Sequence, residues 1–100
     1  MHEFELSGKA KADLRSIAAY TQRKWGKEQR LVYLRHLNEA FHLLAEKQTL
    51  GIACDYIKPN YRKFPVLSHI IFYRTLSENR IKIVRVLHKR MDVKSNLAEP

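Results

Sequence analysis

The chain has 100 residues, 45% of them hydrophobic, and a formal net charge of +9 at pH 7, and this length predicts a single domain over residues 1–100. It contains no run of about 18 apolar residues and no signal peptide, which excludes a membrane span and predicts a cytoplasmic protein. The single cysteine, Cys54, excludes an internal disulfide and a zinc site built on cysteine pairs.

The N-terminal half predicts a strand followed by two helices. Residues 4–7 alternate apolar and polar, as in a short strand, and Ser7 is a suitable N-cap for a helix from Lys9 to Trp25. The apolar positions of that segment follow helical spacing, and Gly26 is expected to end it in the left-handed conformation. A second helix over residues 27–47 repeats the spacing. The short link between them predicts an antiparallel helical hairpin.

Large side chains in the first sixty residues are expected in the core. The aromatic residues at helical spacing are interpreted as core packing rather than as a platform for stacking bases: Trp25, Tyr33 and Phe41. Residues 52–60 show no clear period and are predicted to form a loop. Its large side chains are expected to anchor it in the core: Ile52, Tyr56 and Ile57.

Three strands are predicted in the C-terminal half, over residues 61–64, 69–76 and 80–88. Pro65 and Ser68 separate the first two strands, and residues 77–79 form the hairpin between the last two.

Arg85 occupies an unusual place in the last of these strands. Alternation with a period of two would place it on one face with apolar neighbours, namely Ile81, Ile83 and Leu87. A guanidinium on an apolar face requires a carboxylate or carbonyl partner. We therefore predict a structural ion pair between Arg85 and Asp13, because the first helix should pack on the same sheet.

The order of elements predicts an α+β fold. An N-terminal strand and an antiparallel two-helix hairpin would pack with a mainly antiparallel four-stranded sheet, with the hairpin on one face. A short helical tail is expected over residues 92–97. The first strand must either lie at an edge of the sheet or pair with the last strand.

The basic charge is concentrated in the C-terminal half. Residues 61–94 contain nine basic and two acidic side chains, whereas residues 1–60 contain ten and seven. Such a surface suits a phosphate backbone and an acidic protein segment equally well. No helix-turn-helix is legible, so direct sequence-specific DNA binding is not expected.

No catalytic residue, metal site or cofactor is predicted, because few residues have the spacing that such sites require. Cys54 lies beside Asp55, but no histidine has a spacing that would make it a base for this thiol. His36 and His42 are six residues apart and so lie on different sides of a helix. His88 could serve as a general base, but at a strand end we favour a hydrogen bond that it donates to the backbone.

A set of residues spread over the chain carries a recognisable pattern: Ala12-Asp13-Leu14, Ile17, Tyr20-Thr21, Trp25-Gly26, Gln29, Tyr33-Leu34, Leu37, Leu44-Ala45, Leu50-Gly51, Tyr61-Arg62, the run from His69 to Tyr73, the run from Ile83 to His88, and Met91-Asp92. In this order and spacing the chain resembles the ParE toxins of bacterial type II toxin-antitoxin modules, within the wider ParE/RelE fold. The resemblance covers about residues 4 to 97.

The resemblance implies a small toxin that binds and poisons DNA gyrase, with a role in plasmid or chromosomal stabilisation. It also implies a cognate antitoxin whose acidic, disordered C-terminal segment folds on binding. The basic residues expected to contact the antitoxin are Arg62, Lys63, Arg74 and Lys82. The residues expected to contact the target lie at the end of the last strand: His88, Lys89, Arg90 and Met91.

A second function remains open, because RelE-like relatives of the same fold cut mRNA on the ribosome. Such cleavage needs a base, an acid and cations near the phosphate. The residues that could supply them are Arg62, Lys63, His88, Lys89 and Arg90. RelE-like nucleases typically have a tyrosine close to the C-terminus, and this chain has none after Tyr73. We therefore favour a toxin that is not an enzyme.

Overall fold

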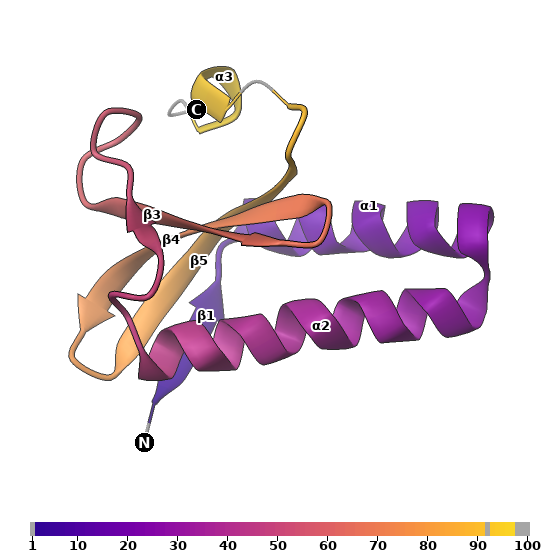
Figure 1. The fold of residues 1–100 in the computed structure, drawn as a ribbon, viewed down its shortest axis with the longest axis horizontal. Helices are drawn as coiled ribbons and strands as arrows, with labels where there is room; N and C mark the ends of the chain where they lie inside the picture. Colours follow the sequence, from indigo (N-terminus) through magenta and orange to yellow (C-terminus); the bar gives the residue numbers. More distant parts are fainter. Residues whose placement is uncertain (1, 92, 98–100) are drawn as a thin grey trace.

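The computed structural model describes residues 2–91 and 93–97, which form three helices and five strands (Figure 1). In chain order these are β1 (Glu3–Leu6), α1 (Gly8–Trp25), α2 (Lys27–Glu46), β2 (Ile52–Ala53), β3 (Tyr61–Val66), β4 (His69–Ser77), β5 (Arg80–His88) and α3 (Val93–Leu97). The strands form one sheet in the order β1-β5-β4-β3-β2, in which only the β1–β5 pair is parallel. The predicted α+β class is confirmed, although the sheet has five strands rather than four.

The extra strand is β2, which the sequence predicted as part of a loop. Ile52 and Ala53 pair antiparallel with Lys63 and Arg62 at the edge of the sheet. Two residues are too few to show a period, so this strand depends on its partner rather than on its own pattern. Pro65 also lies inside β3 instead of ending it.

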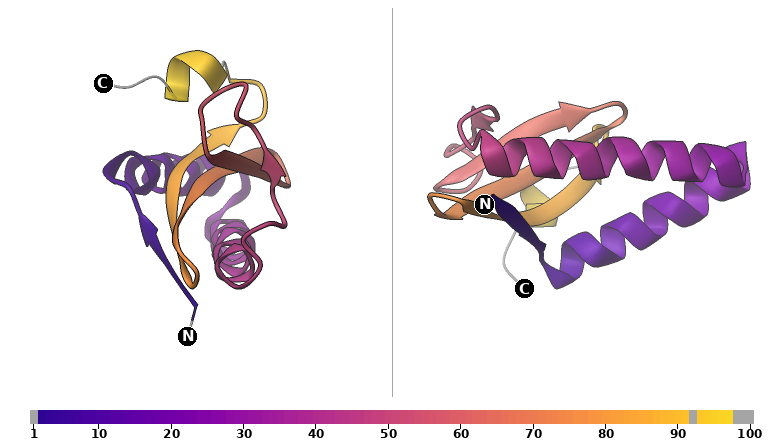
Figure 2. Two further views of the ribbon diagram at one scale, coloured as in Figure 1. Left: turned by 90° about the vertical axis from the view of Figure 1, so that its left-hand side faces the viewer. Right: turned by 90° about the horizontal axis from the view of Figure 1, so that it is seen from below.

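The helical hairpin forms as predicted. The Ser7 side chain accepts a hydrogen bond from the Ala10 amide at 2.9 Å and so caps α1. Gly26 alone links the helices, with a positive φ of 97° but an extended ψ of 169° rather than the left-handed helical geometry expected. The hairpin packs on the sheet at one end, and its free end extends beyond the sheet (Figures 1 and 2). Neither of these helices, nor the short α3, is long and apolar enough to cross a bilayer.

The first strand satisfies both alternatives left open by the sequence, because β1 lies at an edge and pairs with β5. Immediately after β1, the Ser7 amide donates to the Ile83 carbonyl at 3.0 Å and its hydroxyl donates to the Val84 carbonyl at 2.6 Å. Ser7 thus lies where β1 ends and α1 begins. Its hydroxyl also satisfies the carbonyl of Val84, the first residue of β5 beyond the pairing with β1.

A bulge in β5 overturns the predicted division of its side chains between two faces. The register against β4 shifts by one residue at Val84, which reverses the alternation beyond that point. Ile81 and Ile83 pack on the side of the hairpin, whereas Leu87 packs on the opposite side. Arg85 therefore does not share a face with all three.

The two faces of the sheet carry separate apolar clusters. The larger lies between the hairpin and the sheet and includes Leu37, Phe41 and Leu44 of α2. The smaller contains Cys54 and Leu97 and is covered by α3 and the loop before β3. The sheet accordingly lies between α2 and α3 (Figures 1 and 2). The predicted helical tail is present over Val93–Leu97, and Asp92 lies outside the described residues.

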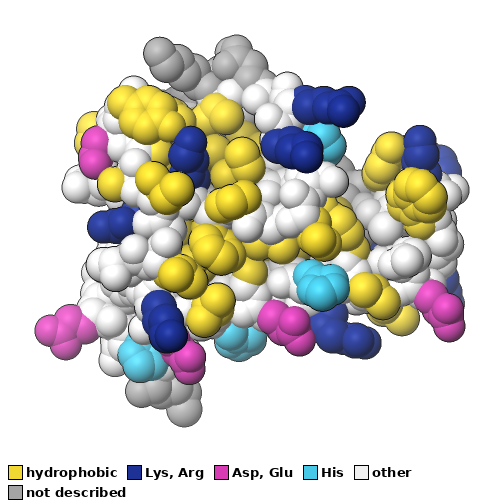
Figure 3. All heavy atoms as spheres, viewed as in Figure 1, with side chains coloured by type: hydrophobic (Ala, Val, Ile, Leu, Met, Phe, Trp, Pro, Cys, Tyr) yellow, Lys and Arg dark blue, Asp and Glu magenta, His cyan; other side chains and the backbone are white. Residues whose placement is uncertain are grey.

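Three large side chains predicted in the core are instead exposed. Trp25 is 65% exposed because it ends α1, where the hairpin has passed the sheet. Ile52 and Tyr56 are 63% and 69% exposed, in the edge strand β2 and in the loop after it. Figure 3 shows hydrophobic side chains over the free end of the hairpin, set apart from the larger group over the sheet. By contrast, Phe41 is buried and Ile57 packs against the smaller cluster.

Candidate functional site

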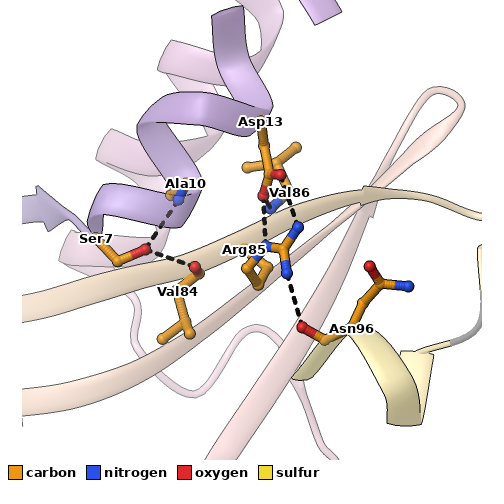
Figure 4. Close-up of polar contacts among 7 residues, drawn as sticks. All are labelled: Ser7, Ala10, Asp13, Val84, Arg85, Val86 and Asn96. Atoms are coloured by element: carbon orange, nitrogen blue, oxygen red, sulfur yellow. Dashed lines mark hydrogen bonds and ion pairs between the residues drawn. The ribbon is translucent and has the colours of Figure 1, made fainter. Parts of the chain in front are cut away.

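The Arg85 guanidinium lies against the Asp13 carboxylate, the partner that the sequence predicted (Figure 4). Arg85 Nε and Nη2 each donate to Asp13 at 2.8 Å, and Nη1 donates to the Asn96 carbonyl at 2.7 Å. The Asp13 carboxylate also accepts from the Val86 amide at 2.9 Å. Hydrogen bonding to Asp13 raises the pKa of Arg85, so the cation is held in its charged form.

This arrangement joins α1, the free edge of β5 and α3. Beyond Leu6 the edge of β5 has no strand beside it, and Asp13 there satisfies an amide that a strand would otherwise pair. Because the guanidinium also donates to the Asn96 carbonyl, Arg85 contributes to holding α3, together with the apolar contacts of Leu97. We interpret the pair as structural.

The residues predicted to contact the target lie beside a groove of about 580 Å³ between the hairpin and the end of the sheet. We call it the hairpin–sheet groove and define it by six of its lining residues: Tyr20, Trp25, Tyr33, His69, His88 and Met91. Two of the four predicted contact residues, His88 and Met91, line this groove, whereas Lys89 and Arg90 lie between them in the chain and are exposed.

A row of three rings lies along the groove. The Tyr33 hydroxyl is 2.6 Å from His69 Nδ1 and accepts a hydrogen bond from the Ser68 amide at 3.2 Å. The His69 ring meets Tyr33 and His88 edge to face, with centroid distances of 5.5 and 5.3 Å. His88 Nδ1 accepts from the Arg90 amide at 3.2 Å, so the ring accepts a backbone hydrogen bond where the sequence predicted that it would donate one.

The Tyr33–His69 pair is uncharged near neutral pH. Burial, followed by the neighbouring His88, lowers the pKa of His69 to about 4, and burial raises the pKa of Tyr33. With both groups neutral, the Tyr33 hydroxyl donates to His69 Nδ1, and the proton of the ring resides on Nε2. His69 therefore adds no positive charge to the groove near neutral pH.

We expect His69 to lower the free energy of unfolding by about 1–2 kcal/mol as the pH falls from about 6.5 to about 4. In this window the unfolded chain binds a proton at His69 that the folded chain does not, so acid favours unfolding. The expected loss is smaller than the full pKa shift implies, because solvent screens the partly exposed ring. Urea titrations across the window would measure it. His69→Phe should flatten the pH slope while the exposed His36→Phe keeps it, and equal slopes in all three proteins would contradict the prediction.

The four basic residues predicted to contact an antitoxin are brought together only in part: Arg62 and Arg74 line one groove, and Arg74 also lines a second groove with Lys82. Arg74 and Lys82 are cross-strand neighbours and line a groove of about 450 Å³ with Lys9 of α1. Arg62 instead donates to the Gly51 carbonyl at 2.7 Å, and Lys63 donates to the Tyr56 hydroxyl at 2.8 Å. We call the Arg74–Lys82–Lys9 surface the sheet-face groove.

The residues considered for RNA cleavage are also spread apart. The ladder pairs His88 with His69 and His69 with Val66, whereas Arg62 and Lys63 lie three to four residues further along β3. At about 3.3 Å per residue, roughly 10 Å separates these two sets of cations along the strands.

Cys54 and the metal-binding residue types offer no alternative centre. Cys54 is fully buried and burial raises the pKa of its thiol, so it is neither accessible nor ionised. Within residues 2–91 and 93–97, no three His, Cys, Asp or Glu side chains lie close enough to hold a metal ion.

The sequence did not identify Tyr20, Tyr33 and His69 as members of a site. Tyr20 is 51% exposed, with the cations of Arg23 and Lys24 5.8 and 6.0 Å from its ring centroid. The one signal available in the sequence was an aromatic pair, Tyr20 and Trp25, that flanks two adjacent basic residues.

Comparison with known proteins agrees with this fold. Residues 4–93 match the family model described as ParE toxin of type II toxin-antitoxin system, parDE. The chain is 47% identical to Toxin ParE1 of Mycobacterium tuberculosis over 92 residues, which cover 92% of this chain and 94% of the relative. It is 36% identical to Toxin ParE1 of Caulobacter vibrioides over 97 residues, covering 97% and 99%.

A solved structure described as a chromosomal ParDE toxin-antitoxin system from P. aeruginosa has the same fold, with a TM-score of 0.74 and 21% sequence identity. The superposition covers 88% of this chain and 96% of the other. The resemblance inferred from the sequence is thus confirmed, and the chain belongs to the ParE toxin family of type II toxin-antitoxin systems.

Proposed function

We propose that the protein inhibits bacterial growth by binding and poisoning DNA gyrase, without breaking a bond with its own side chains, and that a cognate antitoxin neutralises it. Gyrase and the antitoxin are the target and partner that membership of the family implies. The toxin would encounter both gyrase and the antitoxin in the cytoplasm. Two features of the structure support the proposal: the separation of the residues that catalysis would need, and the unpaired positive charges on one face of the sheet.

The separation of the cationic residues carries the argument against catalysis. In-line cleavage of RNA requires a base, an acid and phosphate-binding cations around one phosphate. Here Lys63 and His88 lie about 10 Å apart along the strands, and Lys63 is already engaged with Tyr56. The buried Cys54 thiol is no better placed as a nucleophile.

The ribonuclease alternative retains one supporting observation. Tyr33 and His69 lie beside His88, so folding supplies a tyrosine near a strand-end histidine although none follows Tyr73 in the sequence. Two facts weaken it as an acid–base centre. The Tyr33 hydroxyl and His69 Nδ1 already engage each other, and a pKa of about 4 makes His69 a weak base at neutral pH.

Arg74 and Lys82 are half-buried and lie opposite each other on β4 and β5, and the side chain of neither forms a hydrogen bond or ion pair with a described residue. Like charges placed opposite each other on a sheet destabilise it. A carboxylate from an acidic antitoxin segment would relieve that repulsion, whereas Arg62 and Lys63 would contribute less because each already has a partner.

Induced expression in a bacterium tests the proposal. We expect a DNA-damage response and, with purified gyrase, an accumulation of cleaved DNA that the antitoxin prevents. Cellular mRNA should remain uncut. If the purified protein instead cleaved RNA, free or on ribosomes, and lost this activity in His88→Ala or Arg90→Ala, the protein would be a ribonuclease and the gyrase proposal would be wrong.

A further inference from the structure

The sheet-face groove gathers positive charge without acidic side chains to balance it. The cationic residues in its lining are Lys9, Arg74, Lys82 and Arg85, and no aspartate or glutamate lines it among the described residues. Of these four cations, Arg85 is held by the Asp13 carboxylate (Figure 4). The other three have no ion pair within the part of the chain that the structure describes, so the groove is suited to an anion from outside the protein.

Arg74 and Lys82 are held opposite each other by the strand register. They are ladder partners on β4 and β5, so their side chains leave the same face of the sheet with Cβ atoms roughly 5 Å apart. Glu5 of β1 pairs with Lys82 from the other side, but its carboxylate accepts two hydrogen bonds from Arg80. An arginine fork and a lysine ammonium are thus placed to bind one anion between them.

A phosphate backbone matches the extent of this charge. A single carboxylate would neutralise one of the cations, whereas the backbone of a nucleic acid presents negative charges in series. Lys9 lies in the first turn of α1 and lines the same groove, where it could meet a neighbouring phosphate. That turn contains no acidic residue, so the positive end of the helix dipole adds to the attraction.

The positive charge continues across the sheet. A second groove of about 540 Å³ adjoins the first, since Tyr61 and Arg74 line both. Arg62 also lines this second groove, whose one acidic residue in the described lining is Asp55. The cations therefore extend from α1 over β5 and β4 to β3, and these three strands alone span roughly 10 Å. A row of this kind can follow a phosphate backbone without reading its bases.

We propose that the sheet-face groove is a phosphate-binding site, in which Arg74 and Lys82 hold one backbone phosphate of duplex DNA and Lys9 holds the next. This inference rests on the proposed function, in that the DNA is the segment bound by gyrase in the poisoned complex. A toxin that contacts both the enzyme and the DNA backbone would hold the cleaved complex together, whatever the DNA sequence. An antitoxin carboxylate at the same pair of cations would compete with the DNA.

The salt dependence of DNA binding tests the site, with full-length toxin and a short DNA duplex in the absence of gyrase and antitoxin. One phosphate contact contributes about 0.9 to the slope of log K against log salt concentration, so Arg74→Gln with Lys82→Gln should reduce the slope by about one. Binding at roughly 0.1 M salt should weaken by about tenfold. Arg74→Lys with Lys82→Arg retains both charges and should retain the slope.

The chain offers a matched control in Arg35→Gln with Lys47→Gln. This variant also removes one arginine and one lysine, but both are exposed and lie outside the groove, so the slope should not change. Thermal unfolding should show no loss of stability in the Arg74/Lys82 glutamine variant, because it removes like charges that oppose each other. If that variant were unfolded, Lys9→Gln, which replaces an exposed side chain, should alone reduce the slope by about one.

Gyrase-dependent DNA cleavage separates this inference from the proposed function. We expect cleavage to weaken in the Arg74/Lys82 glutamine variant and to persist in the control. If the wild type poisons gyrase but every variant binds DNA with the same slope, the phosphate site is wrong while the proposed function stands. If the wild type causes no gyrase-dependent cleavage, the proposed function fails, and the slopes measured without gyrase still decide whether the groove binds phosphate.

Two further results would overturn the assignment to DNA. One is binding of inorganic phosphate or pyrophosphate by the wild type without binding of the duplex. The other is loss of antitoxin binding in the Arg74/Lys82 glutamine variant with unchanged DNA binding, which would assign the groove to carboxylates.

Discussion

Replacing Arg85 by alanine should lower the free energy of unfolding by about 3–5 kcal/mol, a large part of the roughly 5–15 kcal/mol that stabilises a typical domain. The side chains of Arg85 and Asp13 are only 14% and 13% exposed, so the variant leaves a buried carboxylate without its cation. It also releases the Asn96 carbonyl and so removes one of the contacts that hold α3. Arg85→Lys should be intermediate, because an ammonium cannot make the paired bonds that the guanidinium makes with Asp13.

Chemical denaturation measures this effect, and the chain contains a matched control. Arg80 forms a similar pair with Glu5 at 2.9 Å, but the two side chains are 46% and 38% exposed. An exposed pair contributes about 0–1 kcal/mol, so Arg80→Ala should unfold almost as the wild type does. A soluble and fully stable Arg85→Ala protein that had lost only its toxicity would instead show that Arg85 is a functional residue.

The elements with a strong period were predictable from the sequence alone. The helices α1 and α2 follow one apolar face over 18 and 20 residues, and the β-branched run of β5 begins and ends at the predicted residues. The Asp13–Arg85 contact was also predictable, because an arginine among apolar residues needs a partner and the fold brings α1 to that strand. In these cases local pattern and global packing agree.

Other features of the fold depend on tertiary contacts that no local sequence pattern encodes. The bulge at Val84 arises from how β5 meets both β4 and the Ser7 end of β1, so the sequence of β5 still alternates as if the bulge were absent. Likewise Trp25 fits the apolar face of α1, and only the length of the hairpin relative to the sheet shows that this face has nothing left to cover at its end.

The candidate site was the least predictable part for the same reason. The hairpin–sheet groove takes its lining from the helical hairpin, from Ser68 and the start of β4, and from the end of β5 with Met91, so folding brings together three regions of the chain that are distant in sequence. The predicted residues His88 and Met91 lie in it, but their partners Tyr33 and His69 could be named only once the strand register was known.

Replacing Lys89 and Arg90 together by alanine should weaken the proposed poisoning of gyrase by about tenfold or more, since two charged contacts at an exposed strand end would be lost. The fold should be retained. Both side chains are exposed, and the hydrogen bonds of this turn come from backbone amides, from Lys89 to Ser68 and from Arg90 to His88. Alanine keeps those amides, so the conformation of the strand end should not change.

Growth inhibition and gyrase-dependent DNA cleavage, both measured without antitoxin, give the size of the loss. Arg23→Ala with Lys24→Ala is the matched control, because it removes the same charge from the free end of the hairpin. Antitoxin affinity of the Lys89/Arg90 variant should fall by only a few-fold, as charges at the rim of an interface act mainly on the association rate. Equal loss of toxicity in the two double variants would show that net charge, and not the strand end, determines poisoning; unchanged toxicity in both would remove residues 89 and 90 from the target contact.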